Sequence, residues 1–193
     1  YINTHQKKTI ITIEDPIEYV HTDKKSFIYQ RDVGNDSSDY KRALKSSLRQ
    51  DPDVILIGEI RDRETMSIAL TAADTGHLVF ATLHTTNAAD TLARILGMYE
   101  PQHHQNVRTM VATVLAGIIS LRLINQVAGG RTPATEILIN TPHIQDCIID
   151  STKRDKLQSA IAEGHIQYKS QTFDQSIYKL SLIHISEPTR LRR

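Results

Sequence analysis

Short apolar runs alternate with stretches of helical periodicity along the first half of the chain. Residues 9–13 are mostly β-branched, with lysines before them and an acidic proline cluster after them, which predicts a buried strand. Residues 54–57 and 78–82 are two further apolar runs of strand length. All three runs are too short for the helices of a globular domain, so we interpret them as strands.

Helical patterns separate these strands. Ser38 or Asp39 can cap a first helix, whose apolar positions share one face. Residues 64–74 form a second helix that Gly76 ends, and Asn87 caps a third. Short apolar strands that alternate with helices predict an α/β fold, with a parallel sheet flanked by helices.

The second half of the chain changes character. A helical stripe continues over residues 107–122, and Gly129 and Gly130 turn the chain into a strand at 133–139. Three more helices are predicted at residues 142–149, 154–163 and 172–180. This half therefore predicts a helical lobe that follows the sheet.

Composition narrows the class of protein. The 193 residues fit one domain with a real core, and 39% of them are hydrophobic. The formal net charge of +1 gives no electrostatic case for a nucleic-acid partner. The longest apolar runs are about six residues, far below the ~20 that span a bilayer, and the single Cys147 excludes an internal disulfide. These features favour a cytoplasmic globular protein.

The two ends of the chain are unusual. The chain begins at Tyr1 rather than Met, and its first residues are typical of the interior of a longer protein. Residues 181–193 lose the helical period, end in a basic cluster and resemble translated sequencing-adapter DNA; an ordinary disordered tail is the alternative. We therefore expect the fold to lie within residues 1–180.

Ionisable residues follow each of the three predicted strands. Glu14 and Glu18 follow the first strand, Glu59 follows the second, and His84 follows the third. A lone acidic residue at a strand end is as often solvated as it is functional. Ionisable residues at the ends of all three strands favour a functional site. Since ligands of an open parallel sheet bind at the carboxyl ends of its strands, this edge is the candidate site.

The strongest single motif is the run that leads through Gly58 to Glu59. Four apolar residues that end at a carboxylate form the Walker B pattern. Such an acid can hold a Mg²⁺-bound water or accept the proton of an attacking water. The residues that follow, Arg61 and Asp62, make the match more specific.

Three long motifs identify a family. The stretch TIEDPIEYV at 12–20 is similar to an Asp box, RQDPDVILIGEIRD at 49–62 to a Walker B motif, and TGHLVFATLHT at 75–85 to a His box. With these motifs in this order, the chain resembles the ATPase domain of the secretion and pilus motor superfamily, closest to pilus retraction ATPases of the PilT/PilU type. The resemblance implies a partial RecA-like P-loop NTPase core followed by a C-terminal helical lobe over residues 1–180.

The resemblance also implies roles for individual residues. Glu59 would orient or deprotonate the attacking water, and Glu18 would support Mg²⁺ and that water. His77 and His84 would contact the γ-phosphate or relay its presence. Arg61 could serve the nucleotide of an adjacent subunit, although surface pairing explains this arginine equally well. For each histidine the alternative is a strand-end residue bonded to a nearby backbone carbonyl.

One part of the nucleotide site is missing from the sequence. None of the eight glycines fits the phosphate-binding pattern Gly-x-x-x-x-Gly-Lys-Ser/Thr. In the family this loop precedes the Asp box, so we expect it, and the family's N-terminal domain, upstream of Tyr1. The chain alone is therefore expected not to hydrolyse ATP.

The resemblance implies ATP and Mg²⁺ as ligands and a hexameric ring as the assembly. It further implies a cytoplasmic motor that is peripheral at the inner membrane, where a pilus platform protein is its partner. Alternatives are a secretion or pilus assembly ATPase and a non-hydrolysing accessory ring subunit. Residues 121–136 lack the cysteines of many assembly and secretion ATPases, whereas 172–178 are closer to PilU-type paralogues. A nucleic-acid translocase is disfavoured by the balanced charge.

Overall fold

The computed structural model describes residues 1–37, 39–126 and 129–181. Contacts within the chain divide it into two units, Tyr1–Leu83 and His84–Arg193. Ser38, one of the two expected helix caps, and the basic segment 182–193 lie outside the described residues.

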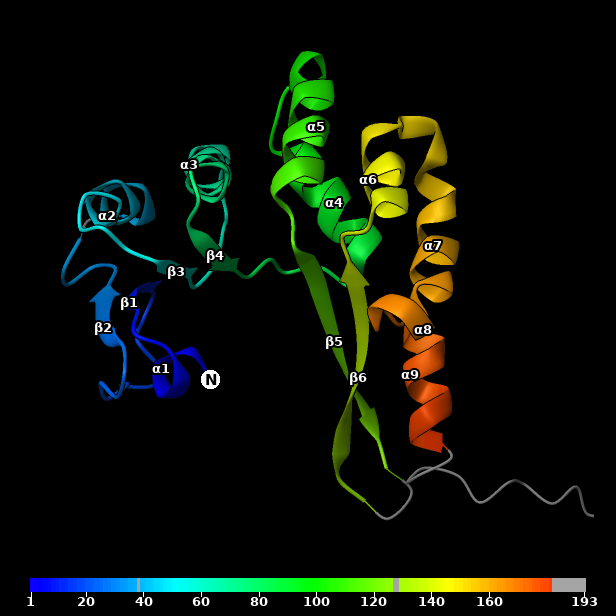
Figure 1. Cartoon of the computed structure of the whole chain (residues 1–193), viewed down its shortest axis with the longest axis horizontal. Coiled ribbons are helices and arrows are strands. Elements are labelled where there is room, and N and C mark those ends of the chain that lie inside the picture. The colour runs from blue at the N-terminus through cyan, green and yellow to red at the C-terminus, as the bar shows by residue number, and fades with distance from the viewer. Residues whose placement is uncertain (38, 127–128, 182–193) are drawn as a thin grey trace, which may run out of the picture. The chain divides into compact units, whose positions relative to one another are not determined.

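The first unit contains a four-stranded parallel sheet with two helices on one of its sides (Figure 1). Its strand order is β2-β1-β3-β4, and every neighbouring pair is parallel. The elements in chain order are α1 (Ile2–His5), β1 (Thr9–Glu14), β2 (Phe27–Asp32), α2 (Tyr40–Ser47), β3 (Val54–Ile57), α3 (Arg63–Asp74) and β4 (Leu78–Ala81). The predicted parallel α/β sheet is confirmed.

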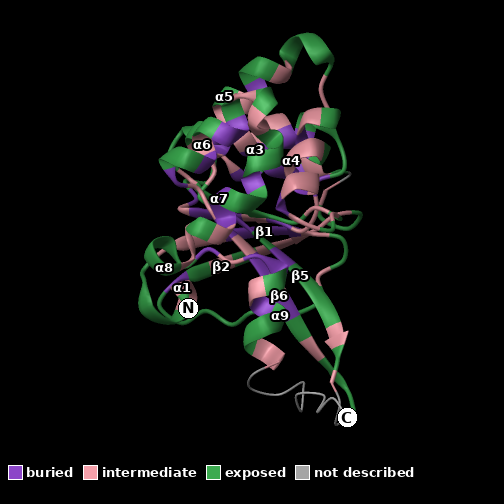
Figure 2. Ribbon diagram, turned by 90° about the vertical axis from the view of Figure 1, so that its right-hand side faces the viewer, coloured by how far each residue is buried: buried purple, intermediate pink, exposed green. Residues whose placement is uncertain are grey.

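The core of this unit lies between the sheet and its helices. Ile11 pairs with Ile55 and Ile13 with Ile57, and all four side chains are fully buried. Leu44 of α2 is also fully buried. The buried residues of β1 are purple in Figure 2. Because laterally paired residues of a sheet share one face, these isoleucines form a continuous apolar surface under the helices.

The second unit combines a long β-hairpin with helices. Its elements are α4 (Ala88–Gly97), a 3₁₀ turn (Pro101–His103), α5 (His104–Val114), β5 (Gly117–Asn125), β6 (Arg131–Ile139), α6 (Pro142–Ile149), a 3₁₀ helix (Ser151–Lys156), α7 (Leu157–Glu163), α8 (His165–Tyr168) and α9 (Phe173–Leu180). β5 and β6 are antiparallel neighbours, and α9 packs along β6. The predicted helices at 142–149 and 172–180 are confirmed, and the one predicted at 154–163 begins as a 3₁₀ helix.

The helix that we expected over residues 107–122 is wrong in its second half. α5 ends at Val114, and from Gly117 the chain is strand β5, in which buried Ile118 and Ser120 alternate with exposed neighbours. The amide of Asn140 explains the early end, since its Nδ2 donates to the carbonyl oxygens of Ala112 at 2.9 Å and Leu115 at 2.6 Å. This cap comes from the end of β6, which local periodicity cannot reveal.

One strand of the sheet was missed. β2 carries Gln30, Arg31 and Asp32 in its second half and forms an edge of the sheet. Its apolar residues Phe27 and Tyr29 are more than half exposed. Its apolar run is only three residues long, 27–29, and polar residues follow at once, so it is shorter than the runs of four or more from which the other strands were predicted.

Among the described residues, no helix is both long and apolar enough to cross a bilayer.

Candidate functional site

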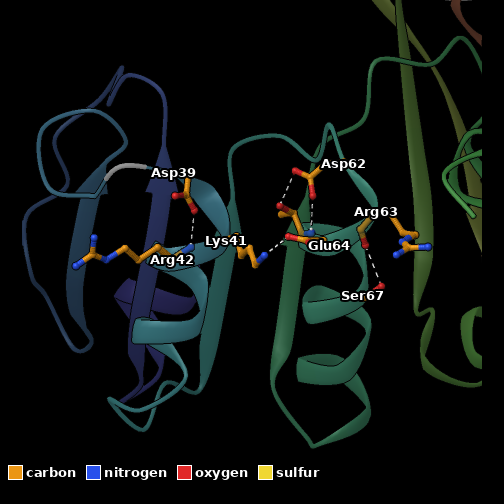
Figure 3. A network of polar contacts seen from close by, with 8 residues as sticks. Asp39, Lys41, Arg42, Asp62, Arg63, Glu64 and Ser67 are labelled. Carbon is orange, nitrogen blue, oxygen red and sulfur yellow. Dashed lines mark hydrogen bonds and ion pairs between the residues drawn. The ribbon is translucent and has the colours of Figure 1, made fainter.

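The carboxyl edge of the parallel sheet brings together the ends of β1 and β3 and the starts of α2 and α3. Each helix connects one parallel strand to a later one, so it must begin at the edge where strands end. Asp39 caps α2 by accepting from the backbone N–H of Arg42 at 2.7 Å. Asp62 caps α3 by accepting from Thr65 N–H at 2.9 Å. Lys41 and Glu64 form an ion pair that joins the two helix starts (Figure 3).

Glu59 follows β3 after a single glycine, Gly58, and the backbone on both sides of it is hydrogen-bonded. Gly58 N–H donates to the Ile13 carbonyl oxygen of β1 at 2.7 Å. Ile60 N–H donates to the Thr82 carbonyl oxygen at 3.1 Å, and the Thr82 hydroxyl donates back to the carbonyl oxygen of Gly58. These bonds extend the sheet beyond its regular strands and fix the place from which the Glu59 side chain leaves.

The Glu59 carboxylate is paired with the guanidinium of Arg61. The Glu59 side chain is only 14% exposed, whereas that of Arg61 is 66% exposed. The hydrogen bond that Arg61 donates to Glu59 raises the pKa of Arg61, and the negative charge of Glu59 adds to the effect. Because the cation is exposed, it has room to leave this largely buried carboxylate for another partner.

Glu14 adds a second carboxylate at this edge. Its Oε1 accepts from the Thr12 hydroxyl at 2.6 Å and from the Gln30 amide at 3.1 Å. Both donors lie on β1 or its neighbour β2, so the sheet itself orients this acid. Glu18, by contrast, is exposed in the loop that follows β1.

Tyr40 is a residue of this edge that the sequence did not indicate. It is the first residue of α2, and its hydroxyl oxygen lies 3.2 Å from the point where a Cβ on Gly58 would stand. Burial raises the pKa of Tyr40, and the charges of Asp15 and Glu59 raise it further. From sequence, this tyrosine was only one position on the apolar face of a helix.

His77 lies at the opposite edge of the sheet. It precedes β4, and Leu78 N–H donates to the carbonyl oxygen of Asp53 before β3. The His77 Nδ1 lies 2.9 Å from the Ala72 carbonyl oxygen, at the end of α3. At about 3.3 Å per residue, the length of β4 places His77 roughly 16 Å along the strand from Thr82. The structure thus does not bring His77 together with Glu59, and it matches the alternative of a histidine bonded to a backbone carbonyl.

His84 is the first residue of the second unit, in the exposed segment that precedes α4. Its neighbour Thr85 shares a hydrogen bond of 2.7 Å with the hydroxyl of Thr91. Asn87 caps α4 by accepting from Asp90 N–H at 2.8 Å, as expected.

The donor set of the edge suits a hard cation that a nucleotide brings with it. Among the described residues, no three His, Cys, Asp or Glu side chains are grouped to share a metal. Mg²⁺ does not need such a group, because proteins hold it through one or two carboxylates together with phosphate oxygens and water. Glu59 and the acids after β1 offer carboxylate oxygens of this kind.

Comparison with known proteins decides the family. Residues 1–129 match the family model described as type II/IV secretion system protein. The chain belongs to this family.

Relatives within the type II/IV secretion family include proteins of pilus motility. The chain is 48% identical over 164 residues to the type IV pilus retraction ATPase PilT of Pseudomonas aeruginosa, which covers 85% of this chain and 47% of the relative. It is 44% identical to a twitching motility protein of Neisseria gonorrhoeae, over the whole chain and 51% of the relative. The chain thus spans about half the length of these relatives, and the resemblance to pilus retraction ATPases is confirmed.

Solved structures of the family share the fold. A crystal structure of the pilus retraction motor PilT with bound ADP superposes with a TM-score of 0.85 at 45% identity, covering 96% of this chain and 52% of that one. The ATPase DotB of Legionella pneumophila superposes with a TM-score of 0.80 at 26% identity, covering 95% and 50%. These matches confirm the α/β fold class.

Proposed function

We propose that the complete protein is a Mg·ATP-hydrolysing motor ATPase that powers type IV pilus retraction, with Glu59 as its Walker B glutamate. One observation carries the proposal: a largely buried carboxylate is fixed at the carboxyl end of β3, in a chain that is 48% identical to a pilus retraction ATPase over 85% of its length. Burial and a rigid backbone are what a residue needs to hold a reacting water in one place.

Glu59 acts on the attacking water. Its carboxylate orients the water and accepts its proton while the water oxygen bonds to the γ-phosphorus, and the bond from that phosphorus to the ADP oxygen breaks. When bound, Mg²⁺ neutralises charge on the phosphates. Glu18 and Glu59 would hold the metal, partly through water. Tyr40 adds a polar group to this edge, where the charges of Asp15, Glu59 and Glu14 all act on it.

Arg61 changes partners in this proposal. Its exposed guanidinium pairs with Glu59, and the side chain is long enough for that group to turn toward a phosphate oxygen. Arginine binds phosphate oxygens strongly. Turning would free the Glu59 carboxylate for the water. His84 is proposed as the phosphate-contacting histidine. For His77 we propose only a structural role, because its ring bonds to a carbonyl oxygen in the last turn of α3.

Residues 1–180 are proposed to form the part of the ATPase domain that carries the acids. The phosphate loop is absent from these 193 residues, and the relatives are about twice as long. Hydrolysis therefore belongs to the complete protein and not to this chain alone. By family resemblance, the complete protein assembles as a homo-hexameric ring in the cytoplasm and engages a pilus platform protein at the inner membrane, without nucleic acid.

The test of this function is Glu59→Gln in the complete protein. Without a base, kcat for ATP hydrolysis should fall by about 100-fold or more, while affinity for Mg·ADP is largely kept, because the amide preserves shape but cannot accept a proton. Colorimetric phosphate release and calorimetric ADP binding measure the two quantities. Cells that carry only this variant should lose twitching.

Glu64→Gln is the matched control. Glu64 lies at the same edge and pairs with Lys41, but its side chain is 57% exposed. An exposed ion pair contributes at most about 1 kcal/mol, so hydrolysis should stay near the unaltered rate. Undiminished hydrolysis by Glu59→Gln would contradict the proposed role, and an unaltered complete protein that hydrolyses no ATP would favour the accessory ring subunit.

An accessory retraction ATPase is a second candidate. The chain is 40% identical over 93% of its length to PilU of Pseudomonas aeruginosa. Expression of the complete protein in strains that lack either PilT or PilU separates the two. We expect restored retraction in the strain without PilT.

A further inference from the structure

The Tyr40 hydroxyl occupies a specific place among the strand ends. A Cβ on Gly58 would meet the Ile13 carbonyl oxygen at 3.1 Å, the Tyr40 hydroxyl oxygen at 3.2 Å and Glu14 Cα at 3.4 Å. The phenol oxygen therefore stands over the backbone where β1 and β3 end, next to the residue before Glu59. A side chain at position 58 would crowd this hydroxyl and the Ile13 carbonyl oxygen, so one of them would have to shift.

The groups around this hydroxyl are mostly acceptors. The charges of Asp15, Glu59 and Glu14 all act on Tyr40, and Arg61 is the cation that acts in the opposite sense. Ionised carboxylates accept hydrogen bonds and donate none. A phenol hydroxyl can donate a hydrogen bond, so Tyr40 supplies a donor beside these acceptors.

Packing alone does not call for this hydroxyl. A phenylalanine ring would fill the same space at the start of α2, whereas a partly buried hydroxyl loses some of its hydration and is compensated if it donates a hydrogen bond. Donors to charged acceptors are worth more than neutral pairs, and they fix the acceptor in one orientation.

We propose that Tyr40 is a positioning residue for ATP hydrolysis, whose hydroxyl donates within the cluster of carboxylates at the ends of β1 and β3 and so fixes Glu59 and its water. The inference rests on the proposed function of Glu59. It assigns Tyr40 to the chemical step and not to the binding of nucleotide.

Tyr40→Phe in the complete protein removes only the hydroxyl. We expect kcat to fall about tenfold, the equivalent of ~1.4 kcal/mol, with KM for ATP changed less than about twofold. Binding gives a readout without turnover: affinity for Mg·ADP should be unchanged, and affinity for Mg·ADP with fluoroaluminate, which imitates the transferring phosphoryl group, should fall by a similar tenfold. Calorimetry measures both affinities.

Tyr29→Phe is the matched control. Tyr29 lies on β2 of the same unit, and 55% of it is exposed. Loss of its hydroxyl should leave the rate and both affinities unchanged. A urea midpoint for each variant close to that of the unaltered protein establishes that the fold is intact.

The outcomes separate this inference from the function on which it rests. If Tyr40→Phe keeps its kcat, or loses ADP and fluoroaluminate affinity to the same extent, Tyr40 does not position the chemical step and the inference is overturned. If Glu59→Gln abolishes hydrolysis in that case, the proposed function still stands. If Glu59→Gln hydrolyses ATP normally, both fail.

Discussion

Gly58 shows how one residue without a side chain organises the candidate site. Its N–H bonds to β1, its carbonyl oxygen accepts from Thr82, and the space above it is taken by the Tyr40 hydroxyl. Three separate parts of the first unit therefore meet at this position. The room left by the absent Cβ is what lets them approach.

We predict that Gly58→Ala destabilises the first unit. The new methyl group would press on the Ile13 carbonyl oxygen at 3.1 Å, which is backbone and cannot swing away. Overpacking of this kind costs about 1–3 kcal/mol, and a lower urea midpoint by circular dichroism would show it. Gly97→Ala is the control, because no atom lies within 4 Å of its added Cβ at the end of α4. There we expect a gain of about 0.5–1 kcal/mol, and equal effects of the two changes would contradict the prediction.

At the scale of elements, Glu136 joins three parts of the second unit. It lies on β6 and is 1% exposed. One carboxylate oxygen accepts from the N–H of Ala88, the first residue of α4, at 2.8 Å, and the other from the Gln158 amide of α7 at 3.2 Å. A negative charge suits the start of a helix, where unpaired N–H groups carry partial positive charge. The carboxylate thus fixes the helix that follows His84.

We predict that Glu136→Ala lowers the free energy of unfolding of the second unit by about 2–4 kcal/mol. The change opens a cavity and leaves the buried N–H of Ala88 without its acceptor. Glu136→Gln should cost less, because its amide oxygen can still accept from Ala88. Urea denaturation measures both, with exposed Glu163→Gln on α7 as a control expected within about 0.5 kcal/mol. If Glu136→Ala has the same urea midpoint as the control, the Glu136 carboxylate does not stabilise the second unit.

At the scale of the whole molecule, each unit has its own core and its own polar ties. In the first unit Asp53, just before β3, accepts from the Lys8 ammonium at 2.7 Å and from Thr9 N–H at 2.8 Å. It thereby ties the start of β3 to the start of β1. The hydrogen bond from Lys8 is the main cause that lowers the pKa of Asp53, and the bond from Thr9 adds to it.

We predict that this tie makes the unit sensitive to acid. A carboxyl group whose pKa is lower in the folded state stabilises the fold above its unfolded pKa of about 3.9, and that stabilisation is lost as the pH falls through the folded value. Asp53→Asn should therefore lower the urea midpoint at pH 7 and bring it closer to that of the unaltered chain as the pH falls below about 4. Exposed Asp74→Asn, at the end of α3, should leave the pH dependence unaltered. A constant gap between Asp53→Asn and the unaltered chain at every pH would contradict the proposed cause.

Much of the fold and part of the candidate site followed from local patterns. Strands β1 and β3 were predicted because each is a largely buried apolar run, and β4 because its four residues are apolar, although most of them are exposed at the edge of the sheet. The helices between the strands were predicted from their apolar faces, and Glu59 was found because it follows such a run. Tyr40 and Glu136 were not found, since their importance depends on partners far away in the chain. His77 and His84 look alike in sequence and differ only in where β4 places them, before the strand or after it.

The family, the parallel sheet and the acids at its carboxyl edge could all be predicted from the sequence, because they depend on residue type and on spacing within one motif. Only the folded chain shows where α5 ends, that the short apolar run of β2 forms an edge strand of the sheet, and which polar groups lie near Glu59. The two groups of features differ in the distance along the sequence over which their interactions act. Hydrophobic periodicity and local helix caps act over a few residues. Other contacts join residues that only the folded chain brings together: Asn140 bonds to the end of α5, Glu136 to the start of α4, and the Tyr40 hydroxyl lies over Gly58.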